Sequence, residues 1–139
     1  MGEGARRRSL IADACYLLGG AALVASAFLH WIARGAGSEL RGHALVDALV
    51  ALGKHVPALS SGRLTSIWYL VPALGAVSWI VWGVIGRGPW ARVVAGVAFA
   101  VALVAALAFR QLAGTARLGW GPKVALGGAV LLVIGSWAP

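Results

Sequence analysis

Asp13 is the residue whose chemistry stands out first, because its carboxyl group lies inside a long apolar run. An ionisable side chain in a membrane segment marks a proton site, a cation site or a charged partner. Asp13 lies only about one turn inside its run, where the positive end of a helix dipole favours a carboxylate. Arg92 is expected to enter the membrane from the same side. We therefore favour a structural ion pair between Asp13 and Arg92 over proton coupling.

A second group of polar side chains lies in residues 37–57, which read GSELRGHALVDALVALGKHVP. His43 and Asp47 are four residues apart, the spacing of neighbours on a helix surface. A metal centre needs three or four convergent ligands, so we expect a surface pair and no metal site. Ser26 and His30 share a helical face, but no third member of a catalytic triad accompanies them. We expect no catalytic residue, no cofactor and no enzymatic activity.

Arg110 ends the third apolar run on the side where Glu39 and Asp47 are expected to lie. Opposite charges a few ångströms apart attract each other near a protein surface. We therefore expect Arg110 to form a second structural ion pair with one of these carboxylates. This pair would anchor residues 38–52.

Four apolar runs position these side chains: residues 10–32, 64–85, 91–109 and 122–138. The chain has 139 residues, of which 60% are hydrophobic and 12% charged, whereas soluble domains have about 25% charged residues. A helix needs ~20 residues to cross about 30 Å of hydrocarbon, and the fourth run is marginal by this measure. The predicted fold is all-α, with a single integral membrane domain formed by a four-span transmembrane helical bundle.

The segment between the first two spans predicts a short amphipathic surface helix over residues 38–52. At 100° per residue its apolar side chains gather on one side, opposite the charged ones. Ser38 is a suitable N-cap and Gly53 a natural stop. This helix is expected to lie in the headgroup layer or, more favourably, to cap the bundle, and its apolar face could also dock a partner. That face consists of Leu45, Leu49 and Leu52.

Short connections and small residues indicate how the spans pack. The turn at residues 86–90, GRGPW, is short enough to force a helical hairpin between the second and third spans. Glycine and alanine inside spans favour close helix contacts, although a composition rich in both produces such spacings by chance as well. Examples are Gly19-Gly20, Gly75 with Gly83, Gly96 with Ala100, and Gly127-Gly128.

Tryptophan side chains mark the expected ends of the spans, since indole rings settle at the headgroup level. Trp79 and Trp82 lie too deep in the second span for this role and are expected to pack against helices or lipid. The boundary residues are Trp31, Trp68, Trp90, Trp120 and Trp137.

The orientation signals disagree. Arg6, Arg7 and Arg8 precede the first span and favour a cytoplasmic amino terminus, whereas the total of lysines and arginines leans the other way. The first span usually dominates, so we expect the amino terminus inside. Residues 1–27 also resemble a secretory signal, but further spans rather than a soluble domain follow, so we expect them to be retained.

The formal net charge of +8 does not indicate nucleic-acid binding. The cations occur in small groups at the ends of apolar runs, where they can meet lipid headgroups. Cys15 is the single cysteine, which excludes an internal disulfide. The preference for arginine, alanine, glycine and valine is typical of a GC-rich bacterial genome, so we expect a bacterial plasma membrane.

These features favour a non-catalytic accessory, scaffold or assembly subunit of a larger membrane complex. The expected partners are the lipid bilayer and another membrane protein or a second copy of this chain. The alternative is a small oligomeric transporter or channel that uses Asp13, because a carboxylate within a span can carry protons or cations.

Overall fold

The computed structural model describes residues 2–31, 41–53, 62–113 and 119–138. Within these residues the four longest helices are long and apolar enough to cross a membrane, and a shorter helix lies between the first two. The predicted all-α, four-span architecture is thus confirmed, and the chain is a multi-pass membrane protein. In chain order the helices are α1 (Glu3–Ser26), α2 (Gly42–Gly53), α3 (Gly62–Ile85), α4 (Pro89–Ala113) and α5 (Trp120–Trp137).

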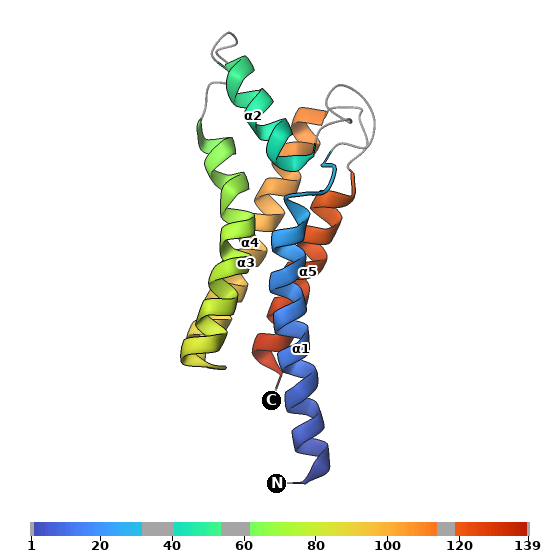
Figure 1. The fold of residues 1–139 in the computed structure, drawn as a ribbon, viewed down its shortest axis with the longest axis vertical. Coiled ribbons are helices and arrows are strands. Elements are labelled where there is room, and N and C mark those ends of the chain that lie inside the picture. The colour runs from blue at the N-terminus through green and yellow to red at the C-terminus, as the bar shows by residue number, and fades with distance from the viewer. Residues whose placement is uncertain (1, 32–40, 54–61, 114–118, 139) are drawn as a thin grey trace.

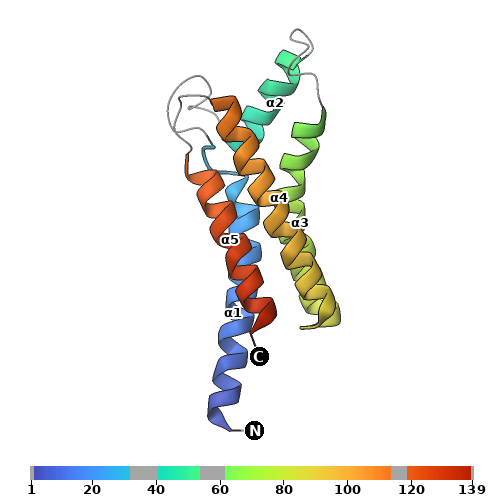
Figure 2. The ribbon, with the colours of Figure 1, turned by 180° about the vertical axis from the view of Figure 1, so that it is seen from behind.

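The four long helices form a closed ring. Helix α1 packs along α5 and α3, and α4 packs against the same two helices from the other side. Both termini lie at one end of the bundle and α2 lies at the other, and the first turns of α1 project beyond the remaining helices (Figures 1 and 2). The two ends of the bundle therefore have different surroundings.

The predicted hairpin between the second and third spans is confirmed. Helix α3 ends at Ile85, and Gly86 follows with φ of +75°, a conformation that favours glycine. The Gly86 N–H donates to the carbonyls of Val81 and Trp82, which closes the last turn of α3. Pro89 then begins α4, where its missing N–H costs no helical hydrogen bond.

Alanines form the inward face of α4. Their spacing alternates between four and three residues, which keeps one stripe of a helix directed at its neighbours. Gly96 and Ala100 are exposed, and a methyl group at Gly96 would meet no atom within 4 Å in the described part of the chain. The contact predicted for Gly96 and Ala100 is therefore not made inside this bundle. The buried stripe consists of Ala91, Ala95, Ala98, Ala102, Ala105 and Phe109.

Glycines allow α1 to lie close to α5 and α3. A methyl group at Gly19 would come within 2.6 Å of the Gly128 carbonyl oxygen on α5. One at Gly75 of α3 would come within 2.7 Å of the Gly20 carbonyl oxygen on α1. Without side chains at these positions the backbones approach closely, which supplies much of the attraction between helices in lipid. This confirms the predicted role of these glycines, whereas Gly83 and Gly127 have open space around them.

Helix α1 ends at Ser26, earlier than the predicted boundary at residue 32. The backbone beyond Ser26 is held by other segments: the carbonyls of Leu29 and His30 accept hydrogen bonds from the N–H groups of Gly42 and Gly121. Non-helical backbone at the edge of a membrane is tolerated when its polar groups are satisfied within the protein. These bonds attach the start of α2 and the start of α5 to the end of α1.

Trp31 occupies the centre of this junction. Its side chain is 0% exposed, and its ring lies 4.8 Å from Phe109 of α4 and 6.0 Å from Trp68 of α3, measured between centroids. Gly42 and Gly121 flank the indole, and a methyl group at either position would overlap it. The Trp31 Nε1–H donates to the Ser26 carbonyl at 2.8 Å, so the buried indole keeps a polar partner.

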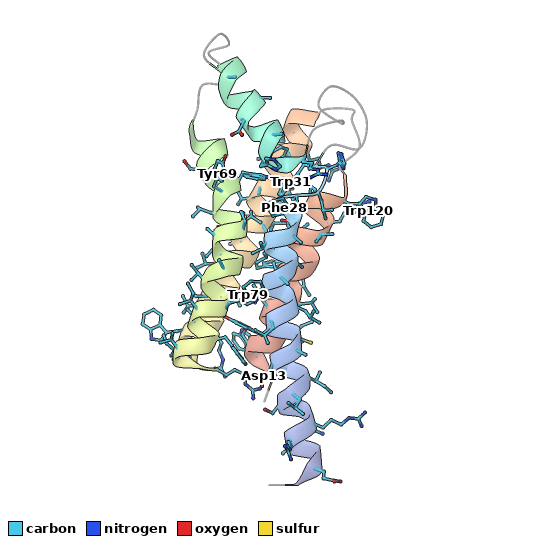
Figure 3. The ribbon with its side chains drawn as sticks, viewed as in Figure 1. Asp13, Phe28, Trp31, Tyr69, Trp79 and Trp120 are labelled. Atoms are coloured by element: carbon cyan, nitrogen blue, oxygen red, sulfur yellow. The ribbon has the colours of Figure 1, made fainter. Side chains whose placement is uncertain are left out.

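The boundary tryptophans fall into two classes. Trp31 lies near the end of the bundle (Figure 3), as expected, but protein rather than headgroups surrounds both it and Trp68. The prediction that these two rings face the interface is therefore wrong, because Gly42 and Gly121 leave space for Trp31 inside the bundle and Trp68 packs against Trp31. Trp90, Trp120 and Trp137 are 62%, 70% and 66% exposed, as an interfacial position requires.

Helix α2 begins at Gly42, four residues after the predicted start at Ser38, which lies outside the described residues. It ends at Gly53, the residue predicted to stop it. It contacts α3 and slants away from the upper end of α1 (Figure 1). Leu45, Leu49 and Leu52 fall within α2, but their side chains lie outside the described part of the chain.

The neighbouring glycines of α5 provide a matched test of this packing. In Gly128→Ala the added methyl group would lie 2.8 Å from the Gly19 carbonyl oxygen and must push α5 from α1. We expect a loss of about 1–3 kcal/mol in unfolding free energy, as for other overpacked sites. Gly127→Ala adds the same group in open space and should be neutral or stabilising by up to ~1 kcal/mol through helix propensity. Denaturant titration in detergent measures both, and equal effects would contradict the packing.

Candidate functional site

A pocket opens at the end of the bundle where both termini lie. Its volume is about 790 Å³, and its lining comes from the first turns of α1, the α3–α4 turn, the first turn of α4 and the end of α5. The lining contains three arginines and, among the residues that the structure describes, no carboxylate. We call it the arginine pocket. Its lining residues are Gly4, Ala5, Arg8, Ser9, Arg87, Gly88, Arg92, Ser136 and Ala138.

Arg87 is held at the edge of this pocket by two contacts with α1. Its Nε lies 3.1 Å from an Asp13 carboxylate oxygen, and its Nη2 donates to the Ser9 hydroxyl at 2.6 Å. Both side chains of the ion pair are about one quarter exposed, at 29% for Arg87 and 26% for Asp13. The pair thus fixes the guanidinium group in place while leaving it open to the pocket.

Asp13 also receives a hydrogen bond from α3. The Trp82 Nε1–H donates to Asp13 Oδ1 at 3.3 Å, and the Trp79 Nε1–H donates to the Leu17 carbonyl at 3.0 Å. Figure 3 shows Trp79 and Asp13 along the side of the bundle where α1 faces α3. Both deep tryptophans therefore pack against a neighbouring helix and join α3 to α1 through polar contacts.

Arg92 faces α5 instead of Asp13. Its Nε donates to the Ser136 carbonyl at 3.4 Å, and its guanidinium carbon lies 5.3 Å from the centroid of the Trp137 ring. Such a placement over an indole is a cation–π contact. The structure therefore pairs Asp13 with Arg87, where the sequence interpretation had named Arg92. The turn places Arg87 beside α1, whereas α4 carries Arg92 along the α5 side.

The groups expected to interact at the other end are arranged differently. Asp47 accepts a hydrogen bond from the Tyr69 hydroxyl at 3.2 Å, which links α2 to α3. Arg110 is exposed at the end of α4, and Glu39, its other expected partner, lies outside the described residues. The His43 ring lies 6.0 Å from that of Phe28. In the described ranges no three metal-ligating side chains of His, Cys, Asp or Glu come together.

The interior between the two ends is apolar. Its buried polar side chains in the described part of the chain are Ser26, Ser78 and Ser136. Each serine hydroxyl donates to a carbonyl three residues earlier in its own helix, as serines in membrane helices commonly do. The Tyr16 hydroxyl and the Trp68 Nε1–H are buried without a partner among the described residues. No chain of polar groups therefore connects the two ends through the described interior.

Sequence reasoning did not find the arginine pocket as a unit. Its arginines come from three separated positions, Arg8, Arg87 and Arg92, and the sequence favoured Arg92, with Arg87 on the same side of the membrane, as the partner of Asp13. One signal was available: Arg87 lies in the tight turn that the expected topology places on the same side as Arg8. The sequence did not indicate that the ends of α1, α3, α4 and α5 meet around one pocket.

A double-mutant cycle distinguishes the two arginines. Because Arg87 contacts Asp13, Asp13→Asn and Arg87→Gln should be non-additive, with a coupling of about 0.5–3 kcal/mol in unfolding free energy. The control cycle of Asp13→Asn with Arg92→Gln should be additive to within ~0.5 kcal/mol. Chemical unfolding in one detergent measures all of the variants. A larger coupling to Arg92 would restore the pairing inferred from the sequence.

A second comparison tests what anchors α2. Tyr69→Phe removes the donor to Asp47 and should speed amide exchange over residues 42–53 by roughly two- to fivefold, because an exposed hydrogen bond contributes towards the lower end of ~0.5–1.5 kcal/mol. Arg110→Ala should have the smaller effect. Hydrogen exchange read by mass spectrometry separates them. A larger effect of Arg110→Ala would support the anchor expected from the sequence.

Comparison with known proteins assigns no family to this chain. No protein-family model, curated protein or solved structure matches the chain.

Proposed function

We propose that this protein is a non-catalytic accessory or assembly subunit of a larger complex in a bacterial plasma membrane. The observation that carries the proposal is the contrast between a closed apolar interior and an uncovered apolar face on α4. The first feature argues against a transport path through a single bundle, and the second supports contact with another membrane protein.

The interior supports the proposal through the way it is filled. Trp31 occupies one end of the bundle, where its ring contacts those of Trp68 and Phe109. Below them, α4 contributes its alanine stripe and α1 its glycines, so the helices approach closely. A path for a polar solute requires polar groups or water along its length. The described interior instead has serines whose hydroxyls are bonded to their own helices.

The outward face of α4 supports the proposal in a complementary way. Val93, Val97 and Leu107 are exposed there, together with Gly96 and Ala100. Lipid can cover such a face, but glycine and alanine four residues apart also allow a second helix to approach the backbone. Within the bundle, Gly19 and Gly128 allow the same kind of close approach between α1 and α5. We propose that the α4 face receives a helix of a partner membrane protein or of a second copy.

The alternative function, a small oligomeric transporter or channel, requires Asp13 to exchange protons or cations. In the bundle Asp13 is engaged by Arg87 and Trp82. These contacts support a structural role for Asp13 better than a role in transport.

Co-purification from native membranes in mild detergent tests the proposal. The wild-type chain should elute with a stoichiometric larger partner or as an oligomer. Gly96→Leu should reduce the recovered complex by about tenfold or more, since a bulky side chain on the contact face blocks close approach. Gly127→Leu is the matched control on α5, because its surroundings are equally open.

Two results would contradict the assembly role. One is a wild-type chain that remains monomeric and free of partners in several mild detergents. The other is a transport activity in reconstituted vesicles that Asp13→Asn abolishes while the bundle stays folded. The second result would establish the transporter in its place.

A further inference from the structure

We propose that the arginine pocket binds the phosphate group of an anionic phospholipid. The ligand chemistry is a phosphate ester held by guanidinium groups, and its source is the headgroup layer of the bilayer. This inference rests on the pocket alone and does not depend on the assembly role.

The arginines supply an excess of positive charge. Arg8, Arg87 and Arg92 line the pocket, and Asp13 beside it neutralises only one of them. Basic pockets between membrane helices are the sites at which anionic headgroups bind. A phosphate would therefore compensate a charge that the described residues around the pocket leave unbalanced.

Two of the guanidinium groups are already oriented. Arg87 uses its Nε for Asp13 and one Nη2 hydrogen for Ser9, so both Nη1 hydrogens and one Nη2 hydrogen are available to a ligand. Arg92 uses its Nε for the Ser136 carbonyl and lies over the Trp137 ring, which leaves its four terminal hydrogens available. Planar groups with paired N–H donors match two oxygens of a phosphate at once. Their orientation before binding lowers the entropy lost when the ligand is held.

The small residues of the lining leave room for the ligand. Gly4, Ala5, Gly88 and Ala138 contribute almost no side-chain volume, and methyl groups at the two glycines would meet no atom within 4 Å. The volume of about 790 Å³ falls within the range of roughly 300–1,000 Å³ for small-molecule sites. The Ser9 hydroxyl accepts from Arg87 and can donate its own hydrogen to a phosphate oxygen.

The position of the pocket favours a lipid as the source of the phosphate. Trp90 and Trp137 lie at the same end of the helices and are strongly exposed, as expected for rings at the headgroup level. Arg8 comes just before the apolar part of α1, which begins at Leu10. The pocket thus lies where the bilayer presents phosphates. A cytoplasmic amino terminus, as expected from Arg6, Arg7 and Arg8, would direct it to the leaflet that carries anionic lipids.

Native mass spectrometry of the full chain in detergent micelles tests the proposal, using phosphatidylglycerol and phosphatidylcholine with identical acyl chains. The wild-type chain should bind phosphatidylglycerol about tenfold more tightly, the order expected for a few charge-assisted hydrogen bonds. Arg8→Gln and Arg92→Gln should each reduce this preference, and the double variant should remove it. Arg110→Gln, at the opposite end of α4, is the control and should retain it. Arg8 is exposed near the free end of α1, so its variant reports on binding without disturbing the fold.

The outcomes separate the two sources of phosphate. Retained binding of phosphatidylglycerol in excess inorganic phosphate, with loss in the arginine variants, supports the lipid site. Displacement by inorganic phosphate at concentrations comparable to the lipid would overturn the lipid assignment in favour of a soluble anion. An equal preference for both lipids, or a preference that Arg8→Gln and Arg92→Gln leave intact, would overturn the site itself.

Discussion

The burial of one indole ring organises the rest of the bundle. Trp31 is too large to be enclosed unless the chain opens a space for it, and Gly42 and Gly121 provide that space beside its Cδ1 and Nε1 atoms. Helix α1 must end before Trp31 so that the chain can bend, and the released carbonyls then accept bonds from the starts of α2 and α5. Phe109 and Trp68 complete the enclosure from α4 and α3. Every helix that the structure describes thus meets at this residue.

The opposite end of the bundle is held by polar contacts. There the ion pair of Asp13 with Arg87 and the bonds of Trp79 and Trp82 join α3 to α1. Arginines converge there on a pocket, whereas aromatic rings fill the space around Trp31. Polar side chains reach outwards at a membrane surface more readily than they pack in hydrocarbon. Buried aromatic rings therefore fill one end of the bundle, and a pocket lined by arginines opens at the other.

Glycine and alanine have two roles in this protein, and the difference bears on its function. Gly19, Gly75 and Gly128 are used within the bundle, where the backbones of α1, α3 and α5 meet. Gly96 carries no contact of this kind among the described residues. In the assembly role proposed above, the first set serves the fold of the subunit and Gly96 serves the contact with its partner. The proposed lipid site would add a contact that fixes the depth and tilt of such an assembly in the bilayer.

The four apolar helices, the hairpin at residues 86–90 and the stop of α2 at Gly53 could all be predicted from the sequence, because hydropathy, glycine and proline act over a few neighbouring residues. Packing between the helices sets which side of each helix is buried, and it turns the α4 alanines inwards and Gly96 outwards. The same packing forms the ion pair of Asp13 with Arg87 instead of Arg92, and it encloses Trp31 within protein. These outcomes depend on the rotation of each helix about its axis and on which helix ends meet. Rotating a helix by half a turn about its axis leaves the mean hydropathy of the span unchanged. Hydropathy along the chain therefore does not predict which side of the helix is buried.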